Sequence, residues 1–583
     1  MADDARTRRL AQSSITEHRA PRMKRVNAID WRVGPLALAL AGLWLTVGAL
    51  PGVHWHDTGE FAAVTWRLAP AHPPGMPAHA LWTHGLLRLP LGDVGLRANL
   101  ASALTLALAT CLFTCGLTRW TSRAWSLALG MTPLLAPAVW LQGVRAEVYA
   151  LHLLLVAGMS LCPPGRGFVA LGLLFGFAAA NHTLLALAAA PLATVAWPWA
   201  GDRAPRIRAL VLGFGAGLAG LTAYAYLPLR AAAGGAVGWG RPDTWAAFVD
   251  TVLARDWHRN MTAPSSAGFS LTENLGSVLE WLADQWGLPA TACLAMCVVL
   301  GLPSAARTHG RPLLVAAALG FCALATRALY PMDPLNPDIG GYFAPALFTA
   351  LAWVAICVGP RPQRALSALL ALALVSVALR FDDGARAQTR TAEQVARSAW
   401  DDVPVRGMWV TADYATWFQG MWLRALLGDR PDTALVFRGR VDAPWHVERA
   451  AEGAAAHTQR LENFPEHLGQ SEDVRFERGV EAHRLGPLGA RLSPDGRGLS
   501  LRPPAARRAE IPDDAVTPAS DPESRVVLCF RRVLAAAELV ERVDLGSVSA
   551  RQAHVEAAER LCPFRDAWLE ALKAPDAARP PGL

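Results

Sequence analysis

The stretch His54-Trp55-His56-Asp57-Thr58-Gly59-Glu60, continued by Ala71-His72-Pro73-Pro74-Gly75, comes directly after the first long apolar segment of the chain. It places two carboxylates and three imidazoles just beyond that segment. Ionisable groups at the edge of a membrane-spanning helix are energetically unfavourable, and they usually mark a functional site. This stretch is therefore the first candidate for such a site, and it requires that the neighbouring apolar segments cross a membrane.

The composition agrees with a membrane protein of many spans that carries a more polar C-terminal part. Of the 583 residues, 52% are hydrophobic, and the mean hydropathy is positive, which is unusual for a single soluble domain. The net charge is +7, and almost all of the basic residues are arginines. These arginines fall in short loops between apolar runs, so the lipid bilayer explains them better than nucleic acid does, and no nucleic-acid partner is expected.

Apolar runs close to the length of a bilayer span predict an all-α polytopic membrane protein with about 11 transmembrane helices. The runs lie at about 34–50, 98–117, 124–141, 147–162, 167–182, 183–199, 209–227, 287–304, 312–329, 342–359 and 364–380. Residues 1–33 form a basic segment, 34–380 the transmembrane domain with a first outer loop at 51–97, and 381–583 a soluble region. We expect the soluble region to be of α/β type.

Two features of the soluble region carry specific predictions. Met408–Thr411 and Ala434–Phe437 are typical of strands, and Tyr414–Leu427 between them is typical of a helix, which together indicate a βαβ-like unit. Cys529 and Cys562 would be able to form a disulfide if this region faces an oxidising compartment.

The arginines also predict the orientation. With eleven spans, every short arginine-containing connection falls on the side of the basic N-terminus, which the positive-inside rule makes cytoplasmic. These connections contain Arg119, Arg123, Arg166, Arg203, Arg206, Arg208, Arg307, Arg311, Arg361 and Arg364. The agreement requires that residues 167–199 form two spans meeting at Asn181-His182-Thr183. The loop 51–97 and everything after residue 380 then face the extracytoplasmic side, the periplasm if the membrane is a bacterial inner membrane.

Asp57 and Glu60 are three residues apart, so on a helical turn they share one face. A carboxylate at this position is able to accept the proton of a hydroxyl group, as glycosyl or acyl transfer requires. Glu60 would position Asp57, bind the acceptor or hold a metal. The structural alternative is that Asp57 or Thr58 caps a helix beginning near Gly59 and that Glu60 stabilises its positive end.

His54, His56, Asp57 and Glu60 have a spacing that would also suit a divalent cation. No matching second cluster follows in the sequence, so we predict no metal and no other cofactor. His72 begins a rigid turn in which two prolines fix φ, and it would either contact a phosphate or serve the turn. The segment Met76–Leu89 that follows resembles an amphipathic helix at the membrane interface.

Other polar groups fall on the same outer face, and each has a structural alternative. Arg145 and Glu147, at the start of the fourth span, would in the structural alternative extend their charged groups to the membrane interface. Residues 181–183 lie at a hairpin tip, which needs a turn-forming residue whether or not it belongs to a site. An arginine at the end of the seventh span suits a lipid-linked phosphate, but ordinary lipid headgroups as well. The residues concerned are Arg145, Glu147, Tyr149, His152, Asn181, His182, Arg230, Asp338 and Tyr342.

These motifs, taken in order, resemble a bacterial and animal family of multi-spanning proteins with the GT-C glycosyltransferase fold. Its animal member is a protein O-mannosyltransferase that acts on plexin-type receptor domains. The resemblance covers about residues 30–440. It rests on Asp57–Glu60, Ala71–Gly75, Ala146–His152, Asn181–Thr183, Tyr226–Arg230, Trp239–Pro242, Asp256-Trp257, Tyr342–Pro345 and Asp429–Asp432. Thr58 departs from the family, which usually has serine there.

The resemblance implies an inverting glycosyltransferase that moves a sugar, typically mannose, from a polyprenyl-phosphate donor to a hydroxyl of a protein or glycan acceptor. It implies that Asp57 is the catalytic base, with Glu60 beside it at the acceptor. It places His72 and Arg230 at the donor phosphate and adds Trp239 to the site candidates. Two other functions are alternatives. One is a transporter or flippase of lipid-linked sugar, which would use the same polar face for permeation. The other is a membrane-anchored scaffold whose C-terminal region binds partners.

Overall fold

The computed structural model describes residues 28–196, 203–234, 237–255, 271–328 and 338–380 of the helical part. In the C-terminal part it describes residues 390, 392–393, 396–397, 400, 408–411, 414–427, 433–437, 446, 474–477, 493–494 and 498–500. The predictions for residues 1–27, for the motifs at 256–257 and 429–432, and for a disulfide between Cys529 and Cys562 concern residues outside these ranges.

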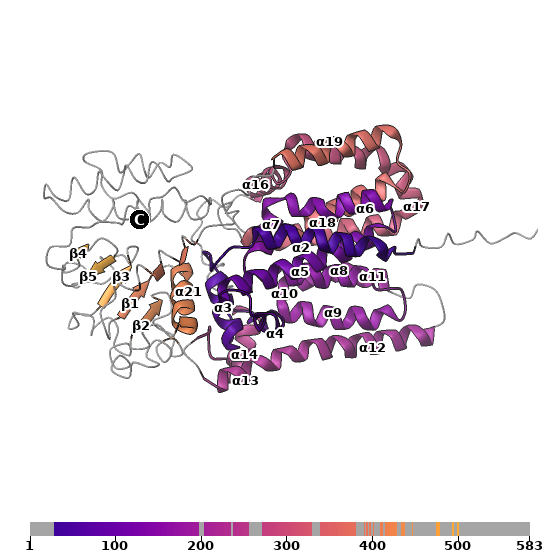
Figure 1. Ribbon diagram of the computed structural model, residues 1–583. Helices are drawn as coiled ribbons and strands as arrows, with labels where there is room; N and C mark the ends of the chain where they lie inside the picture. Colours follow the sequence, from indigo (N-terminus) through magenta and orange to yellow (C-terminus); the bar gives the residue numbers. More distant parts are fainter. Residues whose placement is uncertain are drawn as a thin grey trace, which may run out of the picture.

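Long helices run side by side through the first two thirds of the chain, and shorter ones cover the end of the bundle nearest the C-terminal region (Figure 1). The helices are η1 (Trp31–Val33), α2 (Gly34–Gly48), α3 (Thr58–Arg67), α4 (Pro77–Leu87), α5 (Val94–Leu117), α6 (Arg123–Met131), η2 (Thr132–Leu135), α7 (Pro137–Val144), α8 (Tyr149–Ser160), α9 (Gly167–Asn181), α10 (Thr183–Ala188), η3 (Ala190–Leu192), α11 (Ala193–Ala196), α12 (Arg203–Leu221), η4 (Thr222–Ala225), α13 (Tyr226–Ala232), α14 (Trp245–Val252), α16 (Leu271–Asp284), α17 (Leu288–Ala328), α18 (Asp338–Val358) and α19 (Arg364–Arg380).

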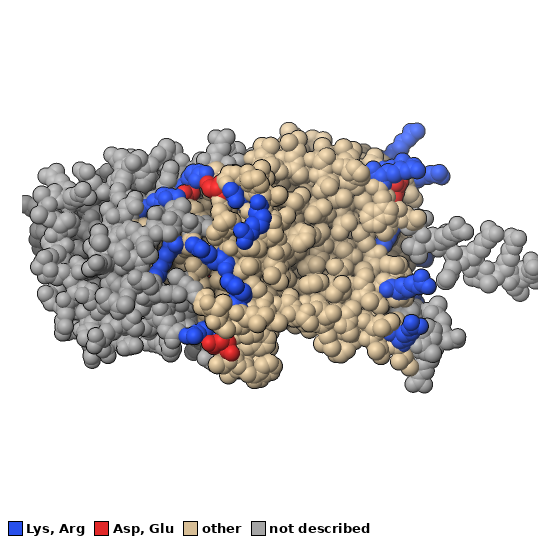
Figure 2. Space-filling view, turned by 60° about the horizontal axis from the view of Figure 1, so that its bottom comes forward, with Lys and Arg blue, Asp and Glu red and all other residues tan. Residues whose placement is uncertain are grey.

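Five helices within the described residues have the length and composition to cross a bilayer, and a bent pair, Arg123–Leu135 with Pro137–Val144, makes a sixth if it counts as one span. Three shorter apolar helices lie at Tyr149–Ser160, Gly167–Asn181 and Arg364–Leu379. On the face drawn in Figure 2, a broad belt without charged side chains lies between two ends that carry arginines. The chain is an integral membrane protein, and the predicted polytopic helical architecture is confirmed.

Each predicted apolar segment overlaps a helix, but several differ from the single straight span that the sequence predicts. The segment at 124–141 is bent by 79°, because Pro133 and Pro137 interrupt its backbone hydrogen bonds. The segments at 287–304 and 312–329 are continuous except for a kink at His309. The segment at 183–199 is divided among α10, η3 and α11 as far as residue 196.

Side-chain size explains how the bundle packs. In α2 the small residues Ala37 and Ala41 are buried, whereas Leu36, Leu40 and Leu43 are exposed on the opposite side and suit contact with lipid. Helices α9 and α12 approach closely because glycines face each other: a Cβ on Gly172 would lie 2.0 Å from the carbonyl oxygen of Gly213. Small residues four positions apart permit this close backbone contact between membrane helices.

Hydrogen bonds define the two ends of the bundle. At one end, Asp30 pairs with Arg123, and the guanidinium group of Arg119 donates to the carbonyl oxygen of Ser160 at 2.9 Å. At the other end, the backbone N–H of Leu50 donates to the carbonyl oxygen of Val144 at 2.9 Å. The chain also reverses here at His182, between α9 and α10 (Figure 1), as the predicted hairpin requires.

A small mixed sheet lies beyond this second end (Figure 1). Its strand order is β2-β1-β3-β5-β4, with β2 and β3 parallel to β1 and with β5 antiparallel to both β3 and β4. The strands are β1 (Met408–Thr411), β2 (Ala434–Phe437), β3 (Val474–Glu477), β4 (Ser493–Pro494) and β5 (Gly498–Ser500). Helix α21 (Tyr414–Trp422) and a π-helical turn at Leu423–Leu427 connect β1 to β2, which confirms the predicted βαβ unit. The sequence gives no pattern for β3, β4 and β5.

Candidate active site at the head of the helix bundle

Helix α3 carries the two carboxylates with which the sequence analysis begins. Asp57 occupies the N-cap position of this helix, but its side chain makes no capping hydrogen bond. The structural alternative, in which this carboxylate caps the helix, therefore does not describe Asp57. Its side chain is 17% exposed, whereas that of Glu60, one turn along α3, is completely buried.

His72 lies between these two carboxylates. Its backbone N–H donates to Oε1 of Glu60 at 2.8 Å, and its Nδ1 lies 2.5 Å from Oε2 of the same residue. Its Nε2 is 3.7 Å from Oδ2 of Asp57. A carboxylate on Nδ1 orients an imidazole and stabilises its charged form, so Glu60, His72 and Asp57 form a connected row of ionisable groups.

Burial and charge shift the pKa values of this row in ways that suit proton transfer. Burial raises the pKa of Asp57 to about 7, although the neighbouring His72 opposes the shift. Burial alone would lower the pKa of His72, but the charges of Glu60 and Asp57 outweigh it and raise that pKa to about 9. A carboxylate with a pKa near neutrality is a suitable general base.

A second group of charges lies within electrostatic reach of the first. NH2 of Arg145 is 2.6 Å from Oδ1 of Asp338 and 3.5 Å from Oε1 of Glu147, and the side chains of Arg145 and Glu147 are almost completely buried. Both Arg145 and Asp338 influence the titration of Asp57. Buried charges of this kind are stable only when paired. The site therefore combines residues of the first outer loop, the start of α8 and the start of α18.

Aromatic rings border this second group. The ring of Tyr149 lies 5.5 Å from that of Tyr342 and 6.3 Å from that of His182, and Nε2 of His182 lies 3.3 Å from Oη of Tyr342. Gly341 has to be glycine for this arrangement, because a Cβ there would lie 2.2 Å from the ring of Tyr149. Three elements, α8, the turn at residue 182 and α18, thus meet at one point.

Two other candidates from the sequence have structural contacts next to this point. Asn181 donates its side-chain amide to the carbonyl oxygen of Val148 at 3.0 Å, which ties the hairpin tip to the segment before α8. His152 lies one turn into α8 and is buried, and His182 is close enough to influence it electrostatically. These contacts fit a supporting role for both residues.

Arg230 lies at the C-terminal end of α3, and Trp239 lies beside the segment that follows this helix. Nε of Arg230 donates to the carbonyl oxygen of Leu68 at 2.5 Å, and its NH2 donates to that of Arg67 at 3.2 Å. Arg230 therefore binds the C-terminal end of α3, where a cation is stabilised by the unpaired carbonyl groups. Trp239 donates its backbone N–H to the carbonyl oxygen of Pro70 at 2.8 Å, and its ring lies 6.3 Å from that of His72.

Asn99 also positions this site, although it belongs to none of the sequence motifs. Asn99 on α5 donates to the carbonyl oxygens of Leu50 and Gly52 at 2.8 Å each, and its Oδ1 accepts from the N–H of Ala146 at 2.8 Å. It thereby joins the first outer loop to the segment that carries Arg145. A lone asparagine near the start of an apolar span is the signal that was available, because such a group needs partners when buried.

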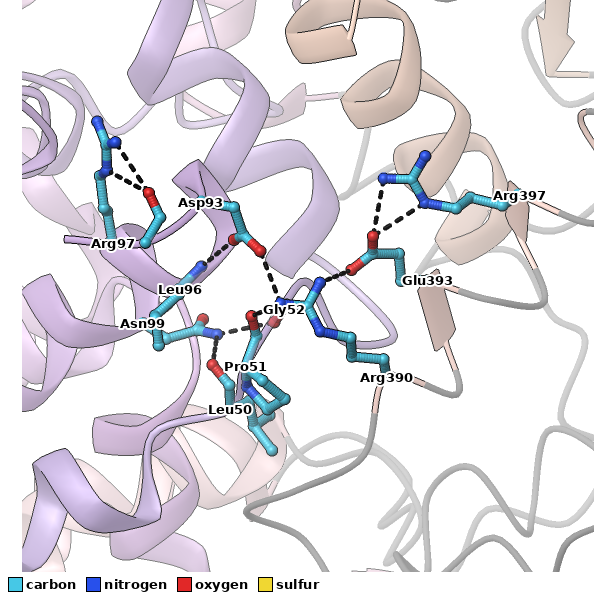
Figure 3. A network of polar contacts seen from close by, with 11 residues as sticks. Leu50, Pro51, Gly52, Asp93, Leu96, Arg97, Asn99, Arg390, Glu393 and Arg397 are labelled. Carbon is cyan, nitrogen blue, oxygen red and sulfur yellow. Dashed lines mark hydrogen bonds and ion pairs between the residues drawn. The ribbon is translucent and has the colours of Figure 1, made fainter. Parts of the chain in front are cut away.

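A second group that the sequence analysis overlooked belongs to the C-terminal region. Phe418 of α21 stacks on His72 with ring centroids 6.1 Å apart, and Tyr414 places its Oη 3.3 Å from Nδ1 of His56. Arg390 donates to Oδ2 of Asp93 and to the carbonyl oxygen of Pro51, both at 2.8 Å (Figure 3). No local sequence pattern predicts contacts between residues more than 290 positions apart.

The alternative of a metal site finds no support among the described residues, where no three His, Cys, Asp or Glu side chains gather as metal ligands. His56 turns toward Tyr414 with a positive φ of 59°, and Glu60 is occupied by His72. Glu60 and Asp57 thus both face His72, whereas His56 faces Tyr414, so these residues do not converge on one point as metal ligands. The prediction that no metal or other cofactor is required stays a prediction.

Comparison with known proteins relates these residues to a family. The model of the protein O-mannosyl-transferase TMEM260 N-terminal domain matches residues 57–163, a range that begins at Asp57 and includes His72, Asn99 and Arg145. A comparison with curated protein sequences gives no match.

Solved structures show the fold. The crystal structure of ArnT from Cupriavidus metallidurans bound to undecaprenyl phosphate is similar with a TM-score of 0.51 and 14% sequence identity, over 82% of this chain and 98% of that one. ArnT from the same organism in the apo state has a TM-score of 0.46 and 14% identity, over 81% and 98% of the two chains. The likeness to the first structure shows the GT-C fold, which confirms the predicted fold class.

Proposed function

We propose that this chain is a membrane glycosyltransferase that moves a sugar from a polyprenyl-phosphate donor to a hydroxyl acceptor on the extracytoplasmic face. The observation that carries the proposal is the carboxylate of Asp57. Asp57 precedes α3 without capping it. Burial raises its pKa to about 7, and its Oδ2 lies 3.7 Å from Nε2 of His72. The match to an O-mannosyl-transferase family model begins at this residue, and a GT-C fold carries it.

In the proposed reaction, Asp57 accepts the proton of the acceptor hydroxyl as that oxygen attacks the anomeric carbon of the sugar. The new carbon–oxygen bond forms on the face opposite to the departing phosphate, so the anomeric configuration inverts. The bond between the anomeric carbon and the phosphate oxygen breaks, and polyprenyl phosphate leaves with the electron pair. General-base catalysis of this kind accelerates a reaction by about 10²- to 10⁴-fold.

Glu60 and His72 support Asp57 in this proposal. The sequence analysis expects His72 at the donor phosphate, but its ring nitrogens lie toward Glu60 and Asp57. We therefore assign His72 to Asp57: as an imidazolium held by Glu60, it keeps the base ionised and directed. The charge of His72 still favours binding of an anionic donor at this end of the bundle.

Arg230 lies at the C-terminal end of α3, about 15 Å along the helix from Asp57, so we assign it to attracting the anionic donor rather than to the bond that breaks. A guanidinium group has five N–H donors, and the bonds of Arg230 to the carbonyl oxygens of Arg67 and Leu68 use two nitrogens. These bonds hold the group at the end of α3.

An apolar groove supports a donor with an isoprenoid chain. It has a volume of about 560 Å³ and lies between α16, α17 and α18, with Trp286, Leu294, Phe321 and Leu347 among the residues that line it. Phe321 is 72% exposed, so the groove opens toward the lipid. The groove runs along α18, whose first turns supply Asp338 and Tyr342 to the site.

We propose mannose as the sugar and a protein Ser or Thr or a glycan as the acceptor, because the matching family model is that of an O-mannosyl-transferase domain. The test incubates the purified full chain, in lipid nanodiscs, with polyprenyl-phosphate mannose and a membrane extract as the source of acceptor. It measures the polyprenyl phosphate that is released. Polyprenyl-phosphate glucose and other lipid-linked sugars test the choice of sugar.

The decisive variant is Asp57→Asn, which keeps the size of the side chain and removes its basicity. We expect release to fall by about 10²- to 10⁴-fold, with an unchanged unfolding temperature. Asp250→Asn is the matched control, because Asp250 lies on α14 in an exposed pair with Arg255, and it should retain activity. Equal release by wild type and Asp57→Asn would refute the role of Asp57. No release from any donor would favour the transporter or scaffold alternatives.

A further inference from the structure

Helix α21 of the C-terminal region sits directly on helix α3. A Cβ added to Gly59 would lie 2.8 Å from the backbone carbonyl oxygen of Phe418, so the two helices touch through their backbones at this point. On either side of this contact, the side-chain amide of Gln419 donates to the carbonyl oxygen of His54. Nε of Arg67 donates to the carbonyl oxygen of Ala425 at 2.8 Å.

The same contact places aromatic rings around His72. The ring of Phe418 stacks on the imidazole with an interplanar angle of 22°, the ring of Phe61 lies 5.6 Å away, and that of Trp239 approaches edge-on. Phe61 and Phe418 are each 1% exposed. The imidazole is thus enclosed by apolar groups, and its nitrogens lie toward Glu60 and Asp57.

A polar network holds the start of the C-terminal region against the first outer loop (Figure 3). Arg390 contacts Asp93 and the carbonyl oxygen of Pro51, and its NH1 lies 3.0 Å from Oε2 of Glu393. Arg397 approaches Oε1 of the same glutamate at 2.8 Å. Because Arg390 and Asp93 are each 40% exposed, this network contributes more to alignment than to stability.

We propose that Phe418 is a positioning residue for the transfer reaction: helix α21 closes over His72 and thereby holds the Glu60–His72–Asp57 row in its reactive arrangement. The proposal rests on the proposed function for its catalytic meaning, but the closure itself is a property of the fold. Exclusion of water strengthens the attraction between an imidazolium and its carboxylates. Aromatic faces also stabilise a neighbouring cation.

Two variants open this contact from opposite sides. Phe418→Leu removes the ring and keeps an apolar side chain, whereas Gly59→Ala inserts a methyl group against the backbone of α21. The matched control is Gly85→Ala, because Gly85 also lies within a helix, α4, and no atom lies within 4 Å of a Cβ placed there. Thermal unfolding of each variant establishes that the fold is retained.

The first measurement does not depend on activity. Diethyl pyrocarbonate modifies neutral, accessible imidazoles, so the labelling is done at about pH 9, where a large share of His72 is neutral. Peptide mass spectrometry follows each histidine of the full chain separately. We expect His72 to resist modification in the wild type and in Gly85→Ala, and to react about tenfold faster or more in Phe418→Leu and Gly59→Ala, because the enclosing aromatic contact is lost. Partly exposed His84 should react equally in all four proteins. Equal resistance of His72 in all of them would overturn the closure by α21.

The second measurement separates kcat from KM for the polyprenyl-phosphate sugar. We expect Phe418→Leu and Gly59→Ala to lower kcat by about tenfold or more, since small displacements of reacting groups have large effects on rate, while KM stays unchanged. Altered labelling with unchanged kcat would overturn the positioning role. If the wild type releases no polyprenyl phosphate from any donor, the proposed function fails, whereas the labelling experiment still decides whether α21 closes over His72.

Discussion

Asp57 occupies the first position of a helix whose N–H groups it does not satisfy. Aspartate at an N-cap normally accepts a hydrogen bond from the second or third residue of the helix. Its carboxylate here turns toward His72 instead. The position thus provides a partly exposed acid group beside a buried, oriented imidazole, which is the arrangement that acid–base chemistry at this residue requires.

The pKa values of Asp57 and His72 predict a bell-shaped pH profile of kcat/KM for the transfer reaction. Asp57 has to be deprotonated to act as a base, so activity should fall about tenfold per pH unit below its pKa of about 7. His72 has to be charged to support it, so activity should also decline above about pH 9. Release of polyprenyl phosphate between pH 5 and 10 checks the prediction, and a flat profile would contradict it.

Glu60→Gln should move the alkaline limb of this profile to lower pH. Glu60 is the largest of the charges that raise the pKa of His72, so its neutralisation lets the imidazolium lose its proton earlier. The measurement is the same pH series on the variant, compared with Asp250→Asn as a variant that changes an acid group elsewhere. An alkaline limb at the wild-type position would argue against the role assigned to the Glu60–His72 contact.

At the scale of single elements, helix α5 supports the site. Its buried Asn99 makes three hydrogen bonds, two to residues at the start of the first outer loop and one to Ala146. Asp93 caps the same helix by accepting from the N–H of Leu96 at 2.8 Å, and it also binds Arg390 from the C-terminal region. One helix thus aligns three segments that are distant in sequence.

Asn99→Ala should destabilise the protein by about 1–3 kcal/mol, because it leaves buried backbone groups without their partners. It should also lower the transfer rate, since both the loop before Asp57 and the segment before Arg145 lose an attachment. The midpoint of thermal unfolding and the release assay measure the two effects. Ser376→Ala, which removes an exposed hydroxyl on α19, serves as the control and should be neutral.

The whole molecule separates its charged residues by position. The pair of Asp30 and Arg123 marks one end of the bundle, and the Glu60–His72–Asp57 row lies at the other. The C-terminal sheet lies beyond the second end, and helix α21 lies between this sheet and α3 (Figure 1). The proposed orientation places the first end in the cytoplasm and the second on the outer face.

Reporter fusions test this orientation. Alkaline phosphatase, which is active only outside the cytoplasm, should be active when fused after Arg380 and inactive when inserted at the kink near His309. The physical reason is that arginines at 307 and 311 flank that kink and retain it on the cytoplasmic side. The reverse pattern would overturn the orientation, and two active fusions would mean that the number of spans between them is even.

Local composition was sufficient for much of the fold. Apolar length predicted the membrane helices, and short apolar runs predicted β1 and β2, because these signals depend on neighbours within a few positions. The bend between η2 and α7 was not predicted, although Pro133 and Pro137 are local signals for it. The kink at His309 falls in the predicted connection between two spans. The strands β3 to β5 were not predicted, because they depend on how distant segments pair.

The site divides in the same way. The sequence by itself determined which residues are candidates for the chemistry, since Asp57, Glu60, His72, Arg145 and Glu147 are ionisable groups beside apolar spans, where only a function or a partner stabilises them. Only the tertiary structure decided their partners: His72 with Glu60 and Asp57, Arg145 with Asp338, and Phe418 on His72. The last two contacts join residues 193 and 346 positions apart, beyond the reach of any local pattern, and they form because the fold of the bundle brings α8, α18 and α21 to α3.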